Sequence, residues 1–216
     1  MNILLVAATA REIEPFFEYY RKHKEWKDLD VLISGIGLTA ATYHLAKQVS
    51  IKRPGLVIQA GVAGCFDHKL PLGTVVAIKR EVLADQSVVE GRELRSMFDL
   101  GLLPADKFPF KNGWLVNNST QLKNTRVPLV DAVSVNHVTT SPEMHQHYLR
   151  KFRPVTESME GAALHFVCRM EKLPFIQLRA VSNFIGERDK AKWDMKTAII
   201  NLNKSLISLV EQFQGL

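Results

Sequence analysis

The chain has 216 residues, of which 46% are hydrophobic and 23% charged, and this balance predicts one globular domain with a substantial core. The net charge of +6 comes from scattered lysines and arginines without a basic stripe, which argues against nucleic-acid binding. No apolar run approaches the roughly 20 residues of a transmembrane helix, and the first residues lack the pattern of a signal peptide. Cys65 and Cys168 have no CxxC spacing, which argues against a disulfide framework or a zinc site. We therefore expect a reduced, cytoplasmic protein that binds neither membranes nor nucleic acids.

Three apolar runs in the first third of the chain are typical of parallel strands that are covered on both faces. They are residues 2–8, 30–37 (with a turn) and 56–64. Between them, apolar residues recur at helical spacing, first from Ala10 and then up to about Ser50. This βαβαβ order predicts a parallel sheet with right-handed crossovers.

The middle of the chain is less regular. Strand pieces are predicted at 74–78, 82–84 and 130–138, whereas residues 85–113 have no steady period and many turn residues. A loop of that length inside a compact domain is usually functional or packed against a partner chain. Ser141, followed by Pro142, then predicts a helix that runs to about residue 152.

The last third of the chain again shows clear periods. Apolar residues after Ser158 recur at helical spacing, residues 175–181 form an apolar strand, and a final amphipathic helix is predicted from Met195. Residues 187–192 between the last two elements are nearly all charged. This charged segment is either a solvated surface or a lid over a site.

Two turns of small residues follow predicted strands. Residues 35–40 have the pattern GxGxxA, which matches the dinucleotide fingerprint, but it follows the second strand, and the next strand ends without the acid that would hold a ribose hydroxyl. The alternatives to a dinucleotide site are a tight turn that needs small residues and a contact with a ribose or phosphate-like group. The second turn, at residues 61–64, ends a neighbouring strand, so both turns are expected to border one crevice.

Two acids, Glu12 and Glu160, lie near the starts of predicted helices that follow strands. Either acid alone could simply stabilise the positive end of its helix. Together with Arg179, Ser182 and Asn183 at the end of another strand, they favour a site at the carboxyl edge of the sheet. No metal is expected, because His145 and His147 are two residues apart on a predicted helix and point to different faces.

Five segments occur in the order seen in the nucleoside phosphorylase and nucleosidase superfamily, which most of the chain resembles. They are NILLVAATAREIE, SGIGLTAA, QAGVAG, ESMEGAA and PFIQLRAVSN. Within its nucleosidase branch, SMEGAALHFVC followed by RAVSNFIGERDKAKW is most similar to the futalosine hydrolases. The resemblance implies one α/β domain over residues 1–216, with three layers and a central mixed, largely parallel, twisted sheet flanked by helices. It also implies cofactor-independent hydrolysis of futalosine to hypoxanthine and dehypoxanthine futalosine, in menaquinone biosynthesis, by a homodimer or larger oligomer.

The resemblance also implies roles for individual residues. Glu12 matches the general base for the attacking water, and Met159 with Glu160 match the pair that holds the ribose. The remaining matches line or support the binding site. They are Ile36 and Trp193 at the 5′ substituent, His137 and Val138 beside the purine, Arg179 and Ser182 supporting the base pocket, Val62, where adenine-specific relatives carry a serine, and Gly64 in the same turn. Arg188 is a candidate partner for a carboxylate at the 5′ end. His137 could instead be a purely structural histidine.

Asn183 departs from the pattern of the nucleosidases that act on methylthioadenosine and adenosylhomocysteine, which carry an aspartate there. An amide cannot protonate the purine N7, but it can accept from a protonated N7 and donate to O6 of a 6-oxopurine. A mismatched buried donor costs about 1–3 kcal/mol, which is enough to select the base. Asn183 therefore favours hypoxanthine or guanine. An adenine-directed nucleosidase, a phosphate-dependent phosphorylase, and a nucleoside- or dinucleotide-binding module without turnover are the alternatives.

Overall fold

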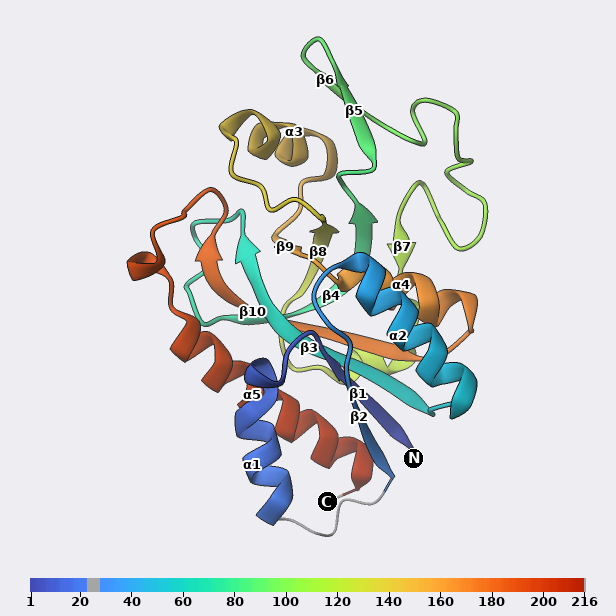
Figure 1. Cartoon of the computed structure of the whole chain (residues 1–216), viewed down its shortest axis with the longest axis vertical. Helices are drawn as coiled ribbons and strands as arrows, with labels where there is room; N and C mark the ends of the chain where they lie inside the picture. Colours follow the sequence, from blue (N-terminus) through green and yellow to red (C-terminus); the bar gives the residue numbers. More distant parts are fainter. Residues whose placement is uncertain (23–27, 216) are drawn as a thin grey trace.

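The computed structural model describes residues 1–22 and 28–215, which form a mixed sheet with helices on both sides (Figure 1). The sheet contains β1 (Ile3–Ala7), β2 (Leu29–Ile33), β3 (Leu56–Cys65), β4 (Val75–Leu83), β7 (Leu115–Val116), β8 (Leu129–Ser134), β9 (Thr156–Ser158) and β10 (Phe175–Phe184). A separate hairpin consists of β5 (Ser87–Glu90) and β6 (Glu93–Ser96). The helices are α1 (Glu14–Lys22), α2 (Leu38–Ile51), α3 (Pro142–Phe152), α4 (Gly161–Met170) and α5 (Met195–Gln214), with 3-10 turns at Ala10–Ile13, Thr120–Asn124 and Lys190–Lys192.

The strands β2, β1 and β3 are parallel neighbours, as the βαβαβ pattern predicts, and β10 adds a fourth parallel strand beside β3. Beyond β10, the sheet continues through β4 and β8 to β9, and β9 pairs back onto β3. Five strands thus close into a ring, which the sequence patterns did not indicate. The ring brings the ends of β3, β9 and β10 together.

Two apolar cores lie on opposite faces of the sheet. On one face, α1 and α5 contribute Phe16, Ala198 and Leu202 to a cluster with the strands. On the other face, α2 and α4 contribute Leu45 and Leu164. Figure 1 shows the same helices on the two sides of the strands. The three-layer α/β architecture is therefore confirmed.

The middle of the chain differs most from the predictions. The pieces predicted at 74–78 and 82–84 are the single strand β4, and the irregular segment 85–113 contains the β5–β6 hairpin. The strand predicted at 130–138 ends at Ser134. Beyond Ser134, backbone N–H groups donate to side-chain carboxylates and not to a neighbouring strand. The N–H of Asn136 donates to Asp85, and the N–H of Thr139 donates to Glu157. The chain therefore leaves the sheet before it reaches residue 137.

The segments that carry the two candidate acids also differ in detail. Glu12 lies in the 3-10 turn Ala10–Ile13 that precedes α1. Glu160 is the N-cap residue of α4, which begins at Gly161, and the residues just before it form the short strand β9. Both acids still lie at the junction of a strand and a helix, as expected. No helix among the described residues is long and apolar enough to cross a membrane.

Candidate active site

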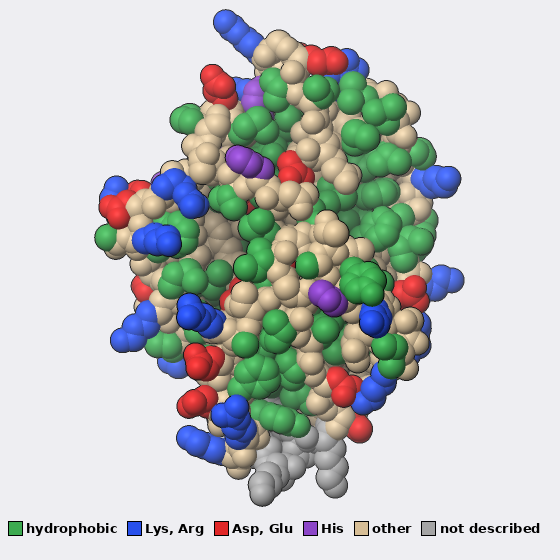
Figure 2. Space-filling view, viewed as in Figure 1, with side chains coloured by type: hydrophobic (Ala, Val, Ile, Leu, Met, Phe, Trp, Pro, Cys, Tyr) green, Lys and Arg blue, Asp and Glu red, His purple; other side chains and the backbone are tan. Residues whose placement is uncertain are grey.

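A cavity of about 330 Å3 lies at the ends of β1, β3, β9 and β10. Its size is within the usual range of small-molecule sites. Figure 2 shows a recess left of the centre, near the ends of β3 and β10 in the view of Figure 1. The cavity is lined by Ala8, Thr9, Glu12, Ile36, Val62, Ala63, Gly64, Val138, Glu157, Ser158, Met159, Glu160, Ser182, Asn183, Ile185, Arg188, Trp193 and Met195.

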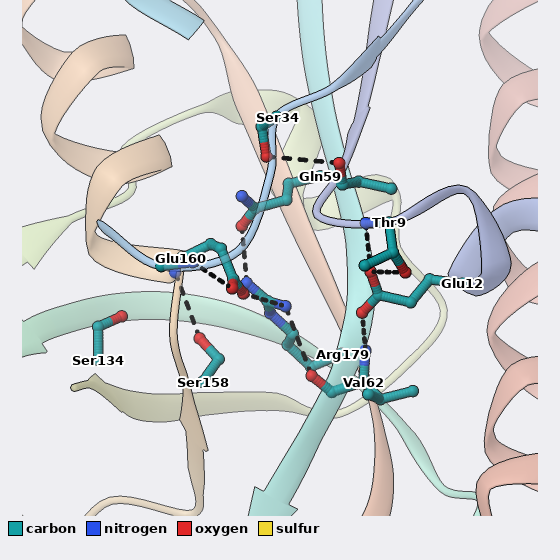
Figure 3. A network of polar contacts seen from close by, with 12 residues as sticks. Thr9, Glu12, Ser34, Gln59, Val62, Ser134, Ser158, Glu160 and Arg179 are labelled. Atoms are coloured by element: carbon teal, nitrogen blue, oxygen red, sulfur yellow. Dashed lines mark hydrogen bonds and ion pairs between the residues drawn. The ribbon is translucent and has the colours of Figure 1, made fainter. Parts of the chain in front are cut away.

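The Glu12 carboxylate is held in place by three hydrogen-bond donors (Figure 3). Its Oε2 accepts from the backbone N–H of Thr9 at 3.0 Å and from the Thr9 hydroxyl at 3.1 Å, and its Oε1 accepts from the N–H of Val62 at 3.1 Å. Thr9 and Glu12 form a capping box, which the T-x-x-E spacing could have predicted. Both carboxylate oxygens are thus oriented before any ligand binds.

The backbone around Glu12 is fixed by α5. The Asn203 side chain donates to the carbonyl of Glu12 at 2.8 Å and accepts from the N–H of Phe16 at 3.0 Å. Asn203 is buried, so both bonds form out of solvent. The last helix of the domain therefore positions an acid near the start of the chain.

Glu160 is tied to a glycine turn and to a buried arginine (Figure 3). Its Oε1 accepts from the N–H of Gly37 at 3.0 Å, and its Oε2 lies 3.5 Å from Nη1 of Arg179. Gly37 has φ +90°, a conformation that favours glycine. The GxGxxA turn therefore directs the N–H of Gly37 to Glu160. This contact explains the glycine at position 37 without a dinucleotide site.

Arg179 lies beneath the cavity and does not line it. Its side chain is only 2% exposed. Besides Glu160, its guanidinium contacts Oε1 of Gln59 at 2.9 Å and the carbonyl of Val62 at 3.4 Å. Its ionic partner is Glu160, and its support of the base pocket stays a prediction. The strand position alone could not show which acid Arg179 would meet.

Gly61 makes room for this arrangement. A Cβ atom at Gly61 would lie 2.5 Å from Nη1 of Arg179 and 2.9 Å from Oε1 of Glu12. Real Cβ atoms do not approach other atoms so closely. A side chain at position 61 would therefore force Arg179 or Glu12 to shift.

Another buried acid, Glu81 of β4, anchors the start of α4 through a serine. The Ser134 hydroxyl donates to Oε1 of Glu81 at 3.0 Å and accepts from the N–H of Ala162 at 2.8 Å. Burial raises the pKa of Glu81 to about 7, although the charge of Arg179 opposes the rise. Ser134 and Glu81 thus fix the helix that carries Glu160 at its N-cap.

Ser182 and Asn183 line the side of the cavity at the end of β10. The Asn183 amide oxygen accepts from the Ser182 hydroxyl at 2.9 Å, and its amide nitrogen donates to the carbonyl of Phe184 at 3.1 Å. An amide has two donor hydrogens and two acceptor lone pairs. Asn183 therefore keeps one donor and one acceptor for a ligand.

Ile36, Arg188 and Trp193 also line the cavity, and Ile36 is 63% exposed. The guanidinium of Arg188 lies over the ring of Trp193, 5.5 Å from its centroid, and the indole N–H donates to the carbonyl of Glu187 at 3.1 Å. The charged segment 186–193 is therefore ordered by its own contacts beside the cavity.

His137 does not line this cavity. It is exposed and borders a separate pocket of about 240 Å3 with Asp85 and Thr139. The predicted strand would have carried it into the site, but the strand ends at Ser134. Val138, the next residue, does line the cavity.

The structure also adds residues that the predictions left out. The polar additions are Thr9, Glu157 and Ser158, and the apolar ones include Ile185 and Met195. Among the described residues, no group of three or more His, Cys, Asp or Glu side chains is arranged to hold a metal ion.

The sequence model of the Phosphorylase superfamily matches residues 6–213. The chain belongs to this superfamily. Two curated relatives are similar to this chain at 28% and 26% identity. Futalosine hydrolase from Thermus thermophilus is 28% identical over 187 residues, which cover 85% of this chain and 82% of the relative. 5′-Methylthioadenosine/S-adenosylhomocysteine nucleosidase from Psychromonas ingrahamii is 26% identical over 193 residues, which cover 88% and 83%.

Solved structures of the superfamily share the fold of this member. 5′-Methylthioadenosine/S-adenosylhomocysteine nucleosidase from Helicobacter pylori has a TM-score of 0.79 at 20% identity, with 98% of both chains covered. Futalosine hydrolase from Helicobacter pylori also has a TM-score of 0.79, at 19% identity and the same coverage. The relatives support a nucleosidase, and their similarity does not separate the two substrates.

Proposed function

We propose that this member of the superfamily hydrolyses the N-glycosidic bond of futalosine, a 6-oxopurine nucleoside with a bulky 5′ substituent, in menaquinone biosynthesis. The products are hypoxanthine and dehypoxanthine futalosine. The observation that carries the proposal is the amide of Asn183, which lines the same cavity as the oriented carboxylates of Glu12 and Glu160. Carboxylates suit the sugar and the water, and an amide suits a 6-oxopurine.

The mechanism follows from the chemistry of N-glycosides, which cleave through an oxocarbenium-like sugar. Glu160 accepts from the ribose hydroxyls, and its position is fixed by Gly37 and Arg179. Glu12 takes the proton of the attacking water, because its two oxygens are held at the cavity wall. The proton that Glu12 takes from the water returns through solvent to N7 of the departing base, where Asn183 accepts from N7–H and donates to O6 and so stabilises the base.

A phosphate nucleophile fits this cavity poorly. The cavity lining includes the carboxylates of Glu12, Glu157 and Glu160, which would repel an anion beside the sugar. The guanidinium of Arg179 beneath it is already paired with Glu160. We therefore favour hydrolysis over phosphorolysis.

One chromatographic assay tests the proposal. Purified protein is incubated separately with futalosine, inosine and methylthioadenosine, each with and without phosphate. We expect hypoxanthine from futalosine at a rate independent of phosphate. Faster release of adenine from methylthioadenosine would identify the adenine-directed nucleosidase instead. Dependence on phosphate would identify a phosphorylase, and binding without release of free base would indicate a binding module.

The adenine-directed alternative has the support of the methylthioadenosine/adenosylhomocysteine nucleosidases among the relatives. Asn183→Asp is therefore a useful companion variant in the same assay. If the amide selects the base, the aspartate variant gains methylthioadenosine cleavage relative to futalosine cleavage. A variant whose ratio of the two rates equals that of the wild type would refute this role of Asn183.

We also propose a homodimer or larger oligomer. Exposed apolar side chains include Ile36 in the cavity lining, Tyr43 on α2, and Leu102 and Phe108 in the irregular segment. A subunit contact would cover such side chains. Light scattering coupled to size-exclusion chromatography checks this expectation, and a mass equal to one chain would contradict it.

A further inference from the structure

A layer of buried polar side chains lies between the sheet and the start of α4. Glu81 of β4, Gln177 of β10 and His165 of α4 are each 0% exposed. Gln177 lies two residues before Arg179 on β10, so the two side chains point to the same face of the strand. Arg179 is in turn the ionic partner of Glu160, the N-cap residue of α4. The layer therefore connects Glu160, which lines the cavity, to groups that do not line it.

Gly161 allows this layer to approach Glu160 closely. A Cβ atom at Gly161 would lie 2.4 Å from Oε2 of Glu81 and 2.5 Å from the side-chain amide of Gln177. Real Cβ atoms are not found so close to other atoms. Gly161 directly follows Glu160 in the chain. The Glu81 carboxyl group and the Gln177 amide therefore meet one residue away from the acid that lines the cavity.

Glu81 and Arg179 do not form an ion pair, although each has an unused polar atom. Oε2 of Glu81 and Nε of Arg179 are buried, and neither has a hydrogen-bond partner within residues 1–22 and 28–215. The ion pair of Arg179 with Glu160 is long, at 3.5 Å, so the guanidinium is not tightly held by one acid. A buried carboxylate is costly without a cation, and an ionised Glu81 would therefore pair with the unused N–H of Arg179. The arrangement fits a neutral, protonated Glu81.

The directions of the hydrogen bonds in the layer agree with a protonated Glu81. Nδ1 of His165 donates to the carbonyl of Leu115 at 2.8 Å, and burial lowers the pKa of His165 to about 4, so its Nε2 carries only a lone pair. The Gln177 amide interacts with both His165 and Glu81. The two ends of an amide have nearly the same shape, and hydrogen bonds decide its orientation. The nitrogen of Gln177 suits Nε2 of His165, which leaves the amide oxygen to accept from a protonated Glu81.

Glu81 can lose this proton near neutral pH. Its direct neighbours in the sheet, Leu115 of β7 and Ala132 of β8, do not titrate. Burial raises the pKa of Glu81 to about 7, the charge of Arg179 opposes the rise, and the charge of Glu160 adds to it. The charge state of Glu81 therefore decides whether one acid or two acids compete for Arg179.

We propose that Glu81 is a positioning residue for Glu160 and acts in its protonated form, in which it leaves the charge of Arg179 to Glu160. An ionised Glu81, whose proton has passed to solvent, draws the guanidinium of Arg179 toward itself. Glu160 then loses the cation that holds its carboxylate in the cavity. The inference deepens the proposed function, in which Glu160 accepts from the ribose hydroxyls, and it predicts weaker substrate binding above about pH 7.

Glu81→Gln separates this role from a purely structural one. The glutamine oxygen can accept from the Ser134 hydroxyl, as the carboxyl group does, and the new amide nitrogen can donate to the oxygen of Gln177. The variant thus keeps the contacts of the protonated acid and cannot ionise. A residue that only anchors α4 would give the wild type and the variant the same dependence of KM on pH.

The first experiment measures kcat and KM for futalosine at pH 6 and pH 8. With a pKa of about 7, roughly one wild-type molecule in ten carries the proton at pH 8, so we expect KM to rise by about tenfold while kcat changes little. For Glu81→Gln, we expect KM to change by less than about twofold, because the variant has no proton to lose. Glu143→Gln, the same change at an exposed position of α3, should behave as the wild type. An equal rise of KM in the wild type and in Glu81→Gln would overturn the inference.

The second experiment needs no substrate. Infrared difference spectra between pH 5 and pH 9 detect the carbonyl band of a buried, protonated carboxyl group. We expect a band that the wild type loses as the pH rises through about 7 and that is missing from Glu81→Gln. Identical spectra of the wild type and the variant would overturn the inference. If the variant does not fold, the wild type decides alone, because midpoints of the band and of the KM rise more than about one pH unit apart would also overturn it.

The inference and the proposed function can thus fail separately. Cleavage of futalosine without the pH-dependent band refutes the role of Glu81 and leaves the function intact. The band without cleavage of futalosine refutes the function, and the KM comparison is then made with methylthioadenosine, which carries the same ribose. If neither nucleoside is cleaved, Glu160 holds no ribose and the positioning role is refuted as well.

Discussion

Glu12→Gln tests the general base directly. The carboxylate is replaced by an amide of the same shape that cannot take a proton from water. General-base assistance contributes typically 10²- to 10⁴-fold, which corresponds to about 3–5 kcal/mol of activation free energy. We therefore expect kcat for hypoxanthine release from futalosine to fall by at least about 100-fold.

The surroundings of Glu12 predict a second effect of the same substitution. One oxygen accepts from the N–H of Thr9 and the other from the N–H of Val62, so the amide nitrogen must face one of these fixed donors in either orientation. An opposed buried donor costs about 1–3 kcal/mol of folding free energy. For a domain of this size, each kcal/mol lowers Tm by about 2–4 °C.

The assay is single-substrate kinetics with thermal melting of the same samples. Thr9→Val provides the matched control, because it removes one donor to Glu12 and keeps the carboxylate. We expect Thr9→Val to retain more turnover than Glu12→Gln. Turnover above about a tenth of the wild-type value in folded Glu12→Gln would refute the general-base role.

Three further predictions follow from the contacts of the site. Gly61→Ala should lower both kcat and Tm in kinetic and melting assays, because its Cβ would displace Arg179 and Glu12. Arg188→Ala should raise KM several-fold for a substrate with a 5′ carboxylate and leave KM for inosine unchanged; an unchanged KM for both would show that the charged segment is only a surface. Glu81→Gln should make stability less dependent on pH. Because burial raises the pKa of Glu81 from 4.5 to about 7, its contribution to stability is fully present below pH 4.5 and is lost as the pH rises through about 7. Chemical denaturation at pH 5 and pH 8 should therefore show the wild type losing more stability than the variant, and equal losses would contradict this reasoning.

Much of the fold could be predicted because buried parallel strands have continuous apolar sequences. The run at 2–8 became β1, and the run at 56–64 became β3, the strand at the centre of the site. The helix after Pro142 was predicted through the cap at Ser141, whose hydroxyl accepts from the N–H of Met144. These features depend on neighbours in sequence, so the sequence alone reveals them.

Other features depend on contacts between distant segments. The end of β8 is set by Asp85 and Glu157, which take the backbone donors of residues beyond Ser134. No local pattern could predict this, and His137 was therefore placed in a strand. The ion pair of Arg179 with Glu160 likewise joins residues of β10 and the start of α4 that only the packed fold brings together.

The hydrogen bonds of Asn203 have a consequence for protein synthesis. They join α5 to the backbone of Glu12 across 191 positions of the chain. A nascent chain on the ribosome can form β1, β3 and β10 before Asn203 emerges from the exit tunnel, but the turn around Glu12 then lacks its buried partner. Glu12, the proposed general base, is thus locked in place only after α5 has been translated and packed. Truncated translation products that lack α5 are therefore expected to be inert toward nucleosides, even where their sheet has begun to assemble.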